Sequence, residues 1–188
     1  MVKVLGVVTL AFALPLAQGS DCALVPKGLL ERPRAEFTGQ YTNHVYGYSV
    51  VIPQGLRGFS SPPPAPQHGF GVPIGNEPRS YLMVSGSWNS LEYENVQRAA
   101  DAEVESIRER HKVVSVDFRK ARLDGLDARR VVIHYTCGTP PTDFVEDTTI
   151  AIAAGKVLEV TLWTSQMKHR EDERVLDAVL RSWKNLDR

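Results

Sequence analysis

The fold of this chain is decided by residues 112–165, KVVSVDFRKARLDGLDARRVVIHYTCGTPPTDFVEDTTIAIAAGKVLEVTLWTS. β-Branched and aromatic residues gather there in four runs that turn residues separate, a pattern typical of strands. In the second run Val131, Ile133 and Tyr135 share one face because side chains alternate along a strand. Ala154-Gly155-Lys156 is typical of a tight hairpin. The sequence therefore predicts an antiparallel meander of four strands, over 112–122, 127–137, 144–153 and 157–165.

Two amphipathic helices are predicted, one before this meander in the sequence and one after it. The first has about 18 residues and ends near His111, and the second covers about 168–186. Asn89 and Glu92 have the spacing of a reciprocal helix cap, with Ser90 as a competing cap position. The apolar stripes are Tyr93, Val96, Ala100, Val104 and Ile107 in the first helix, and Val175, Leu176, Val179, Leu180 and Trp183 in the second.

Shorter strands are predicted before the first helix. Residues 46–52 form one, which Pro53 ends, and 68–74 and 81–86 form two more after a polyproline-like loop at 60–66. One face of a meander needs cover, and the two amphipathic helices can supply it together. The alternative is that the helices lie on opposite faces. The predicted fold class is α+β, an antiparallel β-sheet flanked by helices. A single domain over 41–188 follows an extended lead-in over 20–40.

The order of these elements resembles the Mog1/PsbP/DcrB-like superfamily. The features that carry the resemblance are YGYSVVIP at 46–53, the mid-chain helix, LDGLDARR at 123–130, the Ala-Gly-Lys hairpin, and Arg181-Ser182-Trp183 in the closing helix. The resemblance implies an α/β/α sandwich with a binding or assembly role rather than catalysis. The proline-rich stretch at 60–66 departs from the family pattern, and no functional residue carries over, because fold alone does not determine function.

Residues 1–19 are predicted to be a cleaved secretory signal peptide. Lys3 precedes a 14-residue weakly polar-to-apolar run, VLGVVTLAFALPLA, that is too short to span a bilayer. Ala17 and Gly19 are small, as cleavage after Gly19 requires. Asp21 disfavours lipid attachment at Cys22. The predicted location is secreted or periplasmic, with no transmembrane segment after cleavage.

Charge and cysteine content narrow the class of protein further. Removal of Lys3 with the signal leaves 21 basic and 22 acidic residues, a balance that argues against a nucleic-acid partner. Two cysteines, Cys22 and Cys137, most simply form one disulfide in an oxidising compartment. Two free thiols or an intermolecular bridge are the alternatives.

Two segments are candidate binding surfaces. The loop at 59–81 places Phe59, His68, Phe70 and Tyr81 near four prolines, and such a rigid loop can present a recognition surface at low entropic cost. The alternative is a surface excursion packed on the sheet edge. A second segment, the basic hairpin, gathers positive charge, which either discourages edge-to-edge aggregation or binds an anionic partner such as lipid head groups or acidic polysaccharide. Its residues are Arg119, Lys120, Arg122, Arg129 and Arg130.

No catalytic residues, metal ligands or cofactor are predicted. The spacings of the five histidines match no zinc pattern, and Asp143, Glu146 and Asp147 lack the spacing of a calcium loop. His134 and Cys137 are expected on opposite faces of their strand, so they do not form a nucleophile and base.

Three functions remain from the sequence. The first is an exported, non-enzymatic binding or accessory module with a protein or envelope partner. The second is a small hydrolase-like enzyme that uses His134 or His68 with a carboxylate. The third is a purely structural envelope protein, which predicts no concave or exposed apolar surface.

Overall fold

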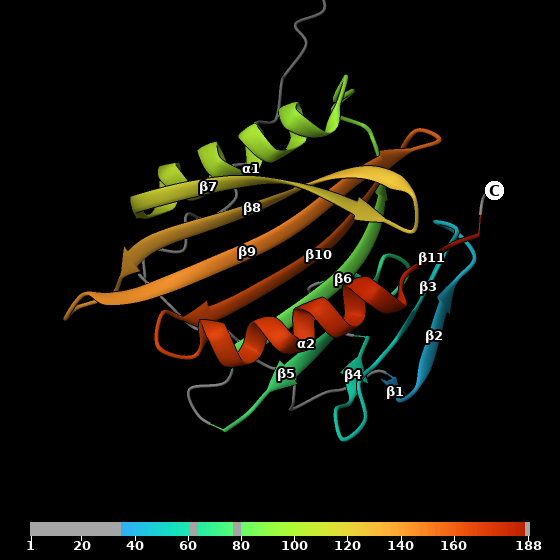
Figure 1. Ribbon diagram of the computed structural model, residues 1–188, viewed down its shortest axis with the longest axis horizontal. Coiled ribbons are helices and arrows are strands. Elements are labelled where there is room, and N and C mark those ends of the chain that lie inside the picture. The colour runs from blue at the N-terminus through green and yellow to red at the C-terminus, as the bar shows by residue number, and fades with distance from the viewer. Residues whose placement is uncertain (1–34, 61–63, 77–79, 187–188) are drawn as a thin grey trace, which may run out of the picture.

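The computed structural model describes residues 35–60, 64–76 and 80–186 (Figure 1). The predicted signal peptide and Cys22 lie outside these ranges. The strands are β1 (Glu36–Phe37), β2 (Gln40–Asn43), β3 (Tyr48–Val51), β4 (Gly58–Phe59), β5 (Gly69–Ile74), β6 (Ser80–Trp88), β7 (Lys112–Leu123), β8 (Leu126–Cys137), β9 (Thr142–Ala153), β10 (Lys156–Ser165) and β11 (Lys184–Asn185), and the helices are α1 (Val96–Arg110) and α2 (His169–Ser182).

The predicted meander is confirmed and forms one end of an eight-stranded antiparallel sheet, in the order β1-β4-β5-β6-β10-β9-β8-β7. Asp124 and Gly125 have φ of 45° and 87°, and Ala154 and Gly155 have φ of 49° and 71°. Positive φ at both central residues matches the twist of the flanking strands in a two-residue hairpin. These two turns set the register of β7 on β8 and of β9 on β10.

The two faces of the large sheet are covered differently (Figure 1). Helix α1 packs on one face against apolar side chains of β8 and β9, among them Val131, Ile133 and Ile150. Helix α2 and a three-stranded sheet, in the order β11-β3-β2, cover the other face. The α+β class and the sandwich expected from the resemblance are confirmed, with the two helices on opposite faces of the large sheet.

The start of α1 corrects the predicted helix cap. The N-cap is Asn95, whose side-chain oxygen accepts hydrogen bonds from the backbone N–H groups of Gln97 and Arg98 at 3.0 and 3.1 Å. Asn89 and Glu92 cannot begin the helix because Glu92 has a φ of 53°. The predicted helix of 18 residues therefore has 15.

Helix α2 ends earlier than the sequence predicts. Trp183 is buried and stacks on Tyr48, with ring centroids 4.7 Å apart. The chain then runs extended, and Lys184–Asn185 pair with β3 as β11. Seating the indole in the core thus converts the predicted last turn of the helix into an edge strand.

The predicted lead-in and first strand are also corrected. Glu36–Phe37 pair with β4, and Gln40–Asn43 pair with β3, so part of the 20–40 segment belongs to the sheets. The predicted strand at 46–52 is shorter, Tyr48–Val51. No helix in the described ranges is long and apolar enough to cross a membrane.

Phe70 and Tyr81 lie in the interior, at 0% and 1% exposure. A Cβ atom on Gly71 would lie 1.6 Å from the Tyr81 hydroxyl oxygen, so the absent side chain makes room for that ring. The sequence predicts that Phe70 and Tyr81 belong to a recognition loop, and the structure corrects this prediction because both side chains lie in the interior.

Phe70→Ala is expected to lower the free energy of unfolding by about 3–5 kcal/mol, the cost of emptying a buried aromatic site. Phe118→Ala is the matched control, because Phe118 is 40% exposed on the edge strand β7, and it should cost less than about 1 kcal/mol. Urea denaturation at constant pH measures both. Equal losses in the two variants would contradict the interior position of Phe70.

Candidate functional site

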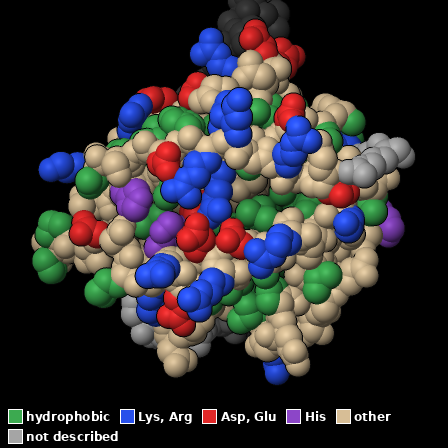
Figure 2. All heavy atoms as spheres, in the orientation of Figure 1, with side chains coloured by type: hydrophobic (Ala, Val, Ile, Leu, Met, Phe, Trp, Pro, Cys, Tyr) green, Lys and Arg blue, Asp and Glu red, His purple; other side chains and the backbone are tan. Residues whose placement is uncertain are grey.

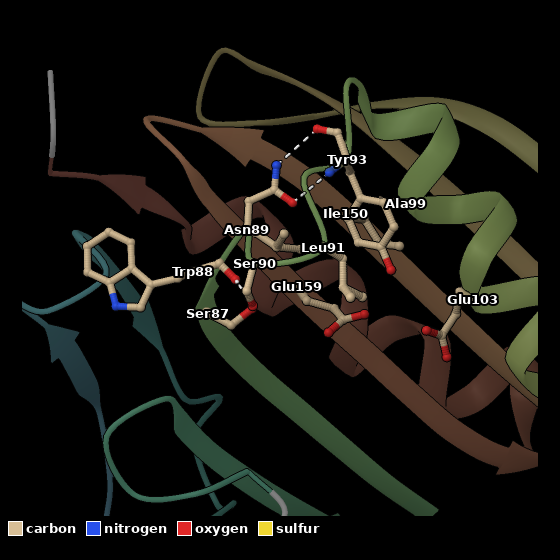
Figure 3. A pocket seen from close by; sticks show the side chains of 11 residues that line it. Ser87, Trp88, Asn89, Ser90, Leu91, Tyr93, Ala99, Glu103, Ile150 and Glu159 are labelled. Carbon is tan, nitrogen blue, oxygen red and sulfur yellow. Dashed lines mark hydrogen bonds between the residues drawn. The ribbon is translucent and has the colours of Figure 1, made fainter. Parts of the chain in front are cut away.

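The candidate site is a pocket of about 230 Å³ where the chain leaves β6 and enters α1 (Figure 3). Its walls come from the β6–α1 connection, from α1, and from β9 and β10. The lining residues are Ser87, Trp88, Asn89, Ser90, Leu91, Tyr93, Ala99, Glu103, Ile150, Val157 and Glu159.

The connection that forms the mouth of this pocket is held by Asn89. Its side chain accepts a hydrogen bond from the Tyr93 N–H and donates one to the Tyr93 carbonyl, both at 2.9 Å. The tight loop so formed leaves Leu91 73% exposed and Trp88 57% exposed. Figure 3 shows the Trp88 ring turned away from the acidic side of the pocket, so Trp88 forms an outer rim.

Two glutamates line the inner part of the pocket. Glu103 comes from α1 and Glu159 from β10, and both carboxylates lie on the same side of Leu91 in Figure 3. A third, Glu146 on β9, is 1% exposed and hydrogen-bonds to Glu103 and to the Trp163 indole. Its Oε1 atom has no conventional donor among the described residues. We call these three residues the glutamate cluster.

Burial and the neighbouring negative charge raise the pKa of two members of the glutamate cluster, Glu146 and Glu159. The pKa of Glu159 is raised to about 7, mainly by burial and next by the charge of Glu103. Burial, followed by the hydrogen bond and charge of Glu103, raises the pKa of Glu146 well above its ordinary range. Burial, followed by the charges of Glu103 and Glu159, raises the pKa of the Tyr93 hydroxyl. Within the described ranges no lysine or arginine forms an ion pair with the three glutamates, so nothing there neutralises the cluster.

The opposite face of the sheet carries a second acidic cluster, which Arg130 bridges. The guanidinium binds Asp147 through two hydrogen bonds of 2.6 and 2.7 Å and reaches Glu173 and Asp177 on α2 at 2.9 and 3.2 Å. Figure 2 shows charged and histidine side chains gathered on this face. Arg130, predicted to bind a partner, is thus engaged within the chain.

Asp147, His169 and Glu173 have the geometry of a metal site, with ligand atoms within 4.8 Å of one another. However, the Asp147 oxygen that His169 reaches at 3.0 Å also accepts from Arg130 at 2.6 Å. Burial pushes the pKa of Asp147 up, but Arg130 and His169 outweigh it and hold that pKa below its ordinary value. The Arg130 guanidinium already occupies the position that a metal ion would take. Together with Asp147, His169 and Glu173, it links α2 to the sheet.

The remaining predicted surface residues are placed separately. Phe59 is half-buried on β4, and His68 donates to the Gly86 carbonyl at 2.7 Å and stacks on Tyr46. With Phe70 and Tyr81 buried, the aromatic side chains of 59–81 do not form one exposed surface. Pro62 and Pro63 of the polyproline-like loop lie outside the described ranges.

The basic hairpin lies at an edge of the large sheet, because β7 is its last strand. Positive charge at an exposed edge disfavours pairing with the strand of another molecule. Lys120, Arg122 and the half-buried Arg129 line an open depression of about 570 Å³ beside the first residue of α1. Binding of an anionic partner there stays a prediction.

The histidines do not form the predicted catalytic pairs. His134 hydrogen-bonds to Gln166 at 2.6 Å, and neither His134 nor His68 contacts a carboxylate among the described residues. His169 does contact Asp147, but no serine, threonine or cysteine of the described chain hydrogen-bonds to the His169 ring. The described hydrogen bonds thus supply no nucleophile for hydrolysis.

Strand alternation separates two other predicted groups. Cys137 packs on the α1 face while Arg130 and its neighbour His134 lie on the other, as the sequence predicts. Asp143 is exposed, and the consecutive residues Glu146 and Asp147 enter opposite clusters. The acidic group weighed for calcium is therefore not brought together.

The sequence prediction missed the glutamate cluster, although it left a signal. Glu146 lies between Phe144 and Thr148 on the α1 face of β9, and Glu159 lies between Val157 and Thr161 on the same face of β10. A charged residue at an inward position of a strand is uncommon without a partner. That irregularity marks the site.

Comparison with known proteins establishes the fold. No family model matches the chain, and no curated protein matches its sequence. The solution structure of cyanobacterial PsbP (CyanoP) from Synechocystis sp. PCC 6803 superposes with a TM-score of 0.56 at 15% identity, over 78% of this chain and 91% of that chain.

Two further structures have the same architecture. The Ran-binding protein Mog1p of Saccharomyces cerevisiae gives a TM-score of 0.54 at 9% identity, over 81% of this chain and 97% of that chain. LpqN, involved in cell envelope biogenesis of Mycobacterium tuberculosis, gives 0.55 at 13% identity, over 80% and 90%. The chain therefore has a Mog1/PsbP-like fold, as its element order predicts.

The glutamate cluster predicts an unusual dependence of stability on pH. A carboxyl whose folded-state pKa is raised stabilises the fold fully below its unfolded pKa, and loses that stabilisation as the pH rises through the folded pKa. For Glu159 the window runs from 4.5 to about 7. As the pH rises through this window, the free energy of unfolding of the wild type should fall by about 2–3 kcal/mol relative to that of Glu159→Gln. The size follows because one pKa unit corresponds to about 1.4 kcal/mol.

Urea denaturation at a series of pH values measures this difference. Glu105→Gln is the control, because Glu105 is an exposed residue of α1 paired with Arg108. The Asp147 ion pair changes stability in the opposite direction but is present in every variant, so it cancels. Parallel curves for the wild type and Glu159→Gln would contradict the raised pKa.

Proposed function

We propose that this chain is an exported, non-enzymatic accessory module that binds a protein partner at the surface where β6 runs into α1. The observation that carries the proposal is the exposure of Trp88 and Leu91 beside the pocket that holds Glu103 and Glu159. Apolar side chains around a concave site with a few polar groups are typical of recognition surfaces.

The alternatives receive less support from the same structure. A purely structural protein predicts neither a pocket nor exposed apolar side chains, and both are present at Leu91. A hydrolase requires a nucleophile within reach of a histidine, and His169 contacts only the Arg130-bound Asp147. Among proteins of this fold, Mog1p is named for Ran binding and LpqN for a part in envelope biogenesis, which is compatible with an accessory role.

Trp88→Ala and Leu91→Asp are each expected to abolish retention of the partner when the tagged chain is used to capture proteins from extracts of its native compartment. Residues that anchor an interface typically cost 2 kcal/mol or more on truncation, about a thirtyfold loss of affinity. Quantitative mass spectrometry of the captured proteins measures the loss.

Met167→Ala is the control, because Met167 is 93% exposed in the turn before α2, away from the pocket. A protein retained by the wild type and by Met167→Ala, but lost from both pocket variants, supports the proposed surface. Retention that none of these substitutions changes would contradict it.

Export predicts a defined covalent product. The chain recovered from its native host should begin at Ser20 and lack residues 1–19, and under non-reducing conditions its mass should correspond to a Cys22–Cys137 disulfide. Intact-mass measurement before and after reduction tests both. A recovered chain that still carries Met1, or a mass unaltered by reduction, would contradict cleavage or the disulfide respectively.

A further inference from the structure

The glutamate cluster lies on a face of the sheet where, among residues 35–60, 64–76 and 80–186, no lysine or arginine forms an ion pair with it. Glu146 is 1% exposed with Oε1 lacking a conventional donor, and its side chain is directed at Glu103, which lines the pocket. On the other face the similarly buried Asp147 is satisfied by Arg130. Glu146 holds a proton that it shares with Glu103, and the Glu103 and Glu159 carboxyl groups line an open pocket with no described lysine or arginine beside them, which indicates that a donor from outside completes the site.

We infer that this pocket, as part of the partner-binding surface proposed above, receives a lysine or arginine side chain of the partner and seats its cationic head between Glu103 and Glu159. Leu91 and Val157 offer apolar surface to the alkyl stem, and the two carboxylates offer charge-assisted acceptors to the head. The volume of about 230 Å³ equals roughly seven water molecules at about 30 Å³ each. A single long side chain fits, whereas a folded segment does not.

The charges around the pocket favour one cation and discourage a second. Glu159 lies opposite Ile150 on β9, and Ile150 lies opposite Arg129 on β8, so the acidic pocket gives way to basic residues within two strands. Lys156 stands 5.6 Å from the Trp88 ring at the outer rim. The site is therefore acidic only where Glu103 and Glu159 face it, with Ser85 donating to Glu159 from the neighbouring strand.

Binding of the cation should release a proton to solvent. In the empty pocket Glu159 has a pKa of about 7 because of burial and the charge of Glu103, so at neutral pH it is partly protonated. An ammonium or guanidinium group beside it favours the ionised carboxylate. Affinity should therefore rise with pH through 7, by at least threefold between pH 6 and pH 8.

The probes for the test are Nα-acetyl-lysine methylamide, Nα-acetyl-arginine methylamide, and the lysine compound acetylated on its side chain, which has the same stem but no charge. Each is titrated into the ¹⁵N-labelled chain at pH 7.5, and amide shifts are followed. Saturable shifts are expected at Trp88, Tyr93 and the first turns of α1, with Kd in the millimolar range for at least one cationic compound and at least tenfold weaker binding of the neutral one.

Glu103→Gln and Glu159→Gln should each weaken binding of the cation at least tenfold, while Glu105→Gln leaves it unchanged. Both pocket variants remove an uncompensated charge, so unfolding midpoints at or above that of the wild type confirm that they are folded. Equal binding of the neutral compound, equal effects of all three substitutions, or shifts produced by calcium chloride but by neither cationic compound would overturn the inference.

Failure of this inference is distinguishable from failure of the proposed function. If Trp88→Ala abolishes partner capture but the cationic probes do not bind, the surface stands and its occupant is not a basic side chain. If the probes bind but Trp88→Ala and Leu91→Asp do not reduce partner capture, the pocket binds cations and the partner binds elsewhere.

Discussion

The charged interior of this protein depends on side-chain alternation along β9. Glu146 and Asp147 are consecutive, so the pleat sends one toward α1 and the other toward α2. Both carboxyl groups are almost inaccessible to water. A shift of register by one residue would exchange them, and would also turn Phe144 and Ile150 away from the helix that covers them. The same constraint that builds the core thus places one buried acid on each face.

The two buried acids, Glu146 and Asp147, are stabilised in different ways. Asp147 accepts a bidentate hydrogen bond from Arg130, which itself reaches two acidic residues of α2, and the result is a clamp between helix and sheet. Among the described residues, Glu146 accepts a hydrogen bond from the Trp163 indole and contacts the Glu103 carboxyl group, so it holds a proton instead. Removal of a cation from a buried pair is strongly destabilising, and for this reason Arg130 is a structural residue rather than part of a binding surface.

Local signals account for what the sequence predicts correctly. The runs of alternating residues and the Asp124-Gly125 and Ala154-Gly155 turns are sufficient for the meander, because such turns join only adjacent antiparallel strands. The misplaced elements depend on tertiary contacts. The indole of Trp183 ends α2 by packing on Tyr48, which is 135 positions earlier in the chain, and the space that Gly71 leaves is visible only once Tyr81 lies across it.

The candidate site shows the same division between local and distant information. Glu103, Glu146 and Glu159 come from three elements, so no short motif contains them, and the only sequence signal is the inward strand position of Glu146 and Glu159. What sets them apart is their position on a face that α1 covers, which follows from strand pairing and helix docking together. A purely structural core would replace them with apolar residues at little cost, since an apolar isostere often equals or exceeds a buried charged group in stability. The presence of three acids where apolar residues would serve the fold as well is the physical reason for proposing this pocket as a binding site.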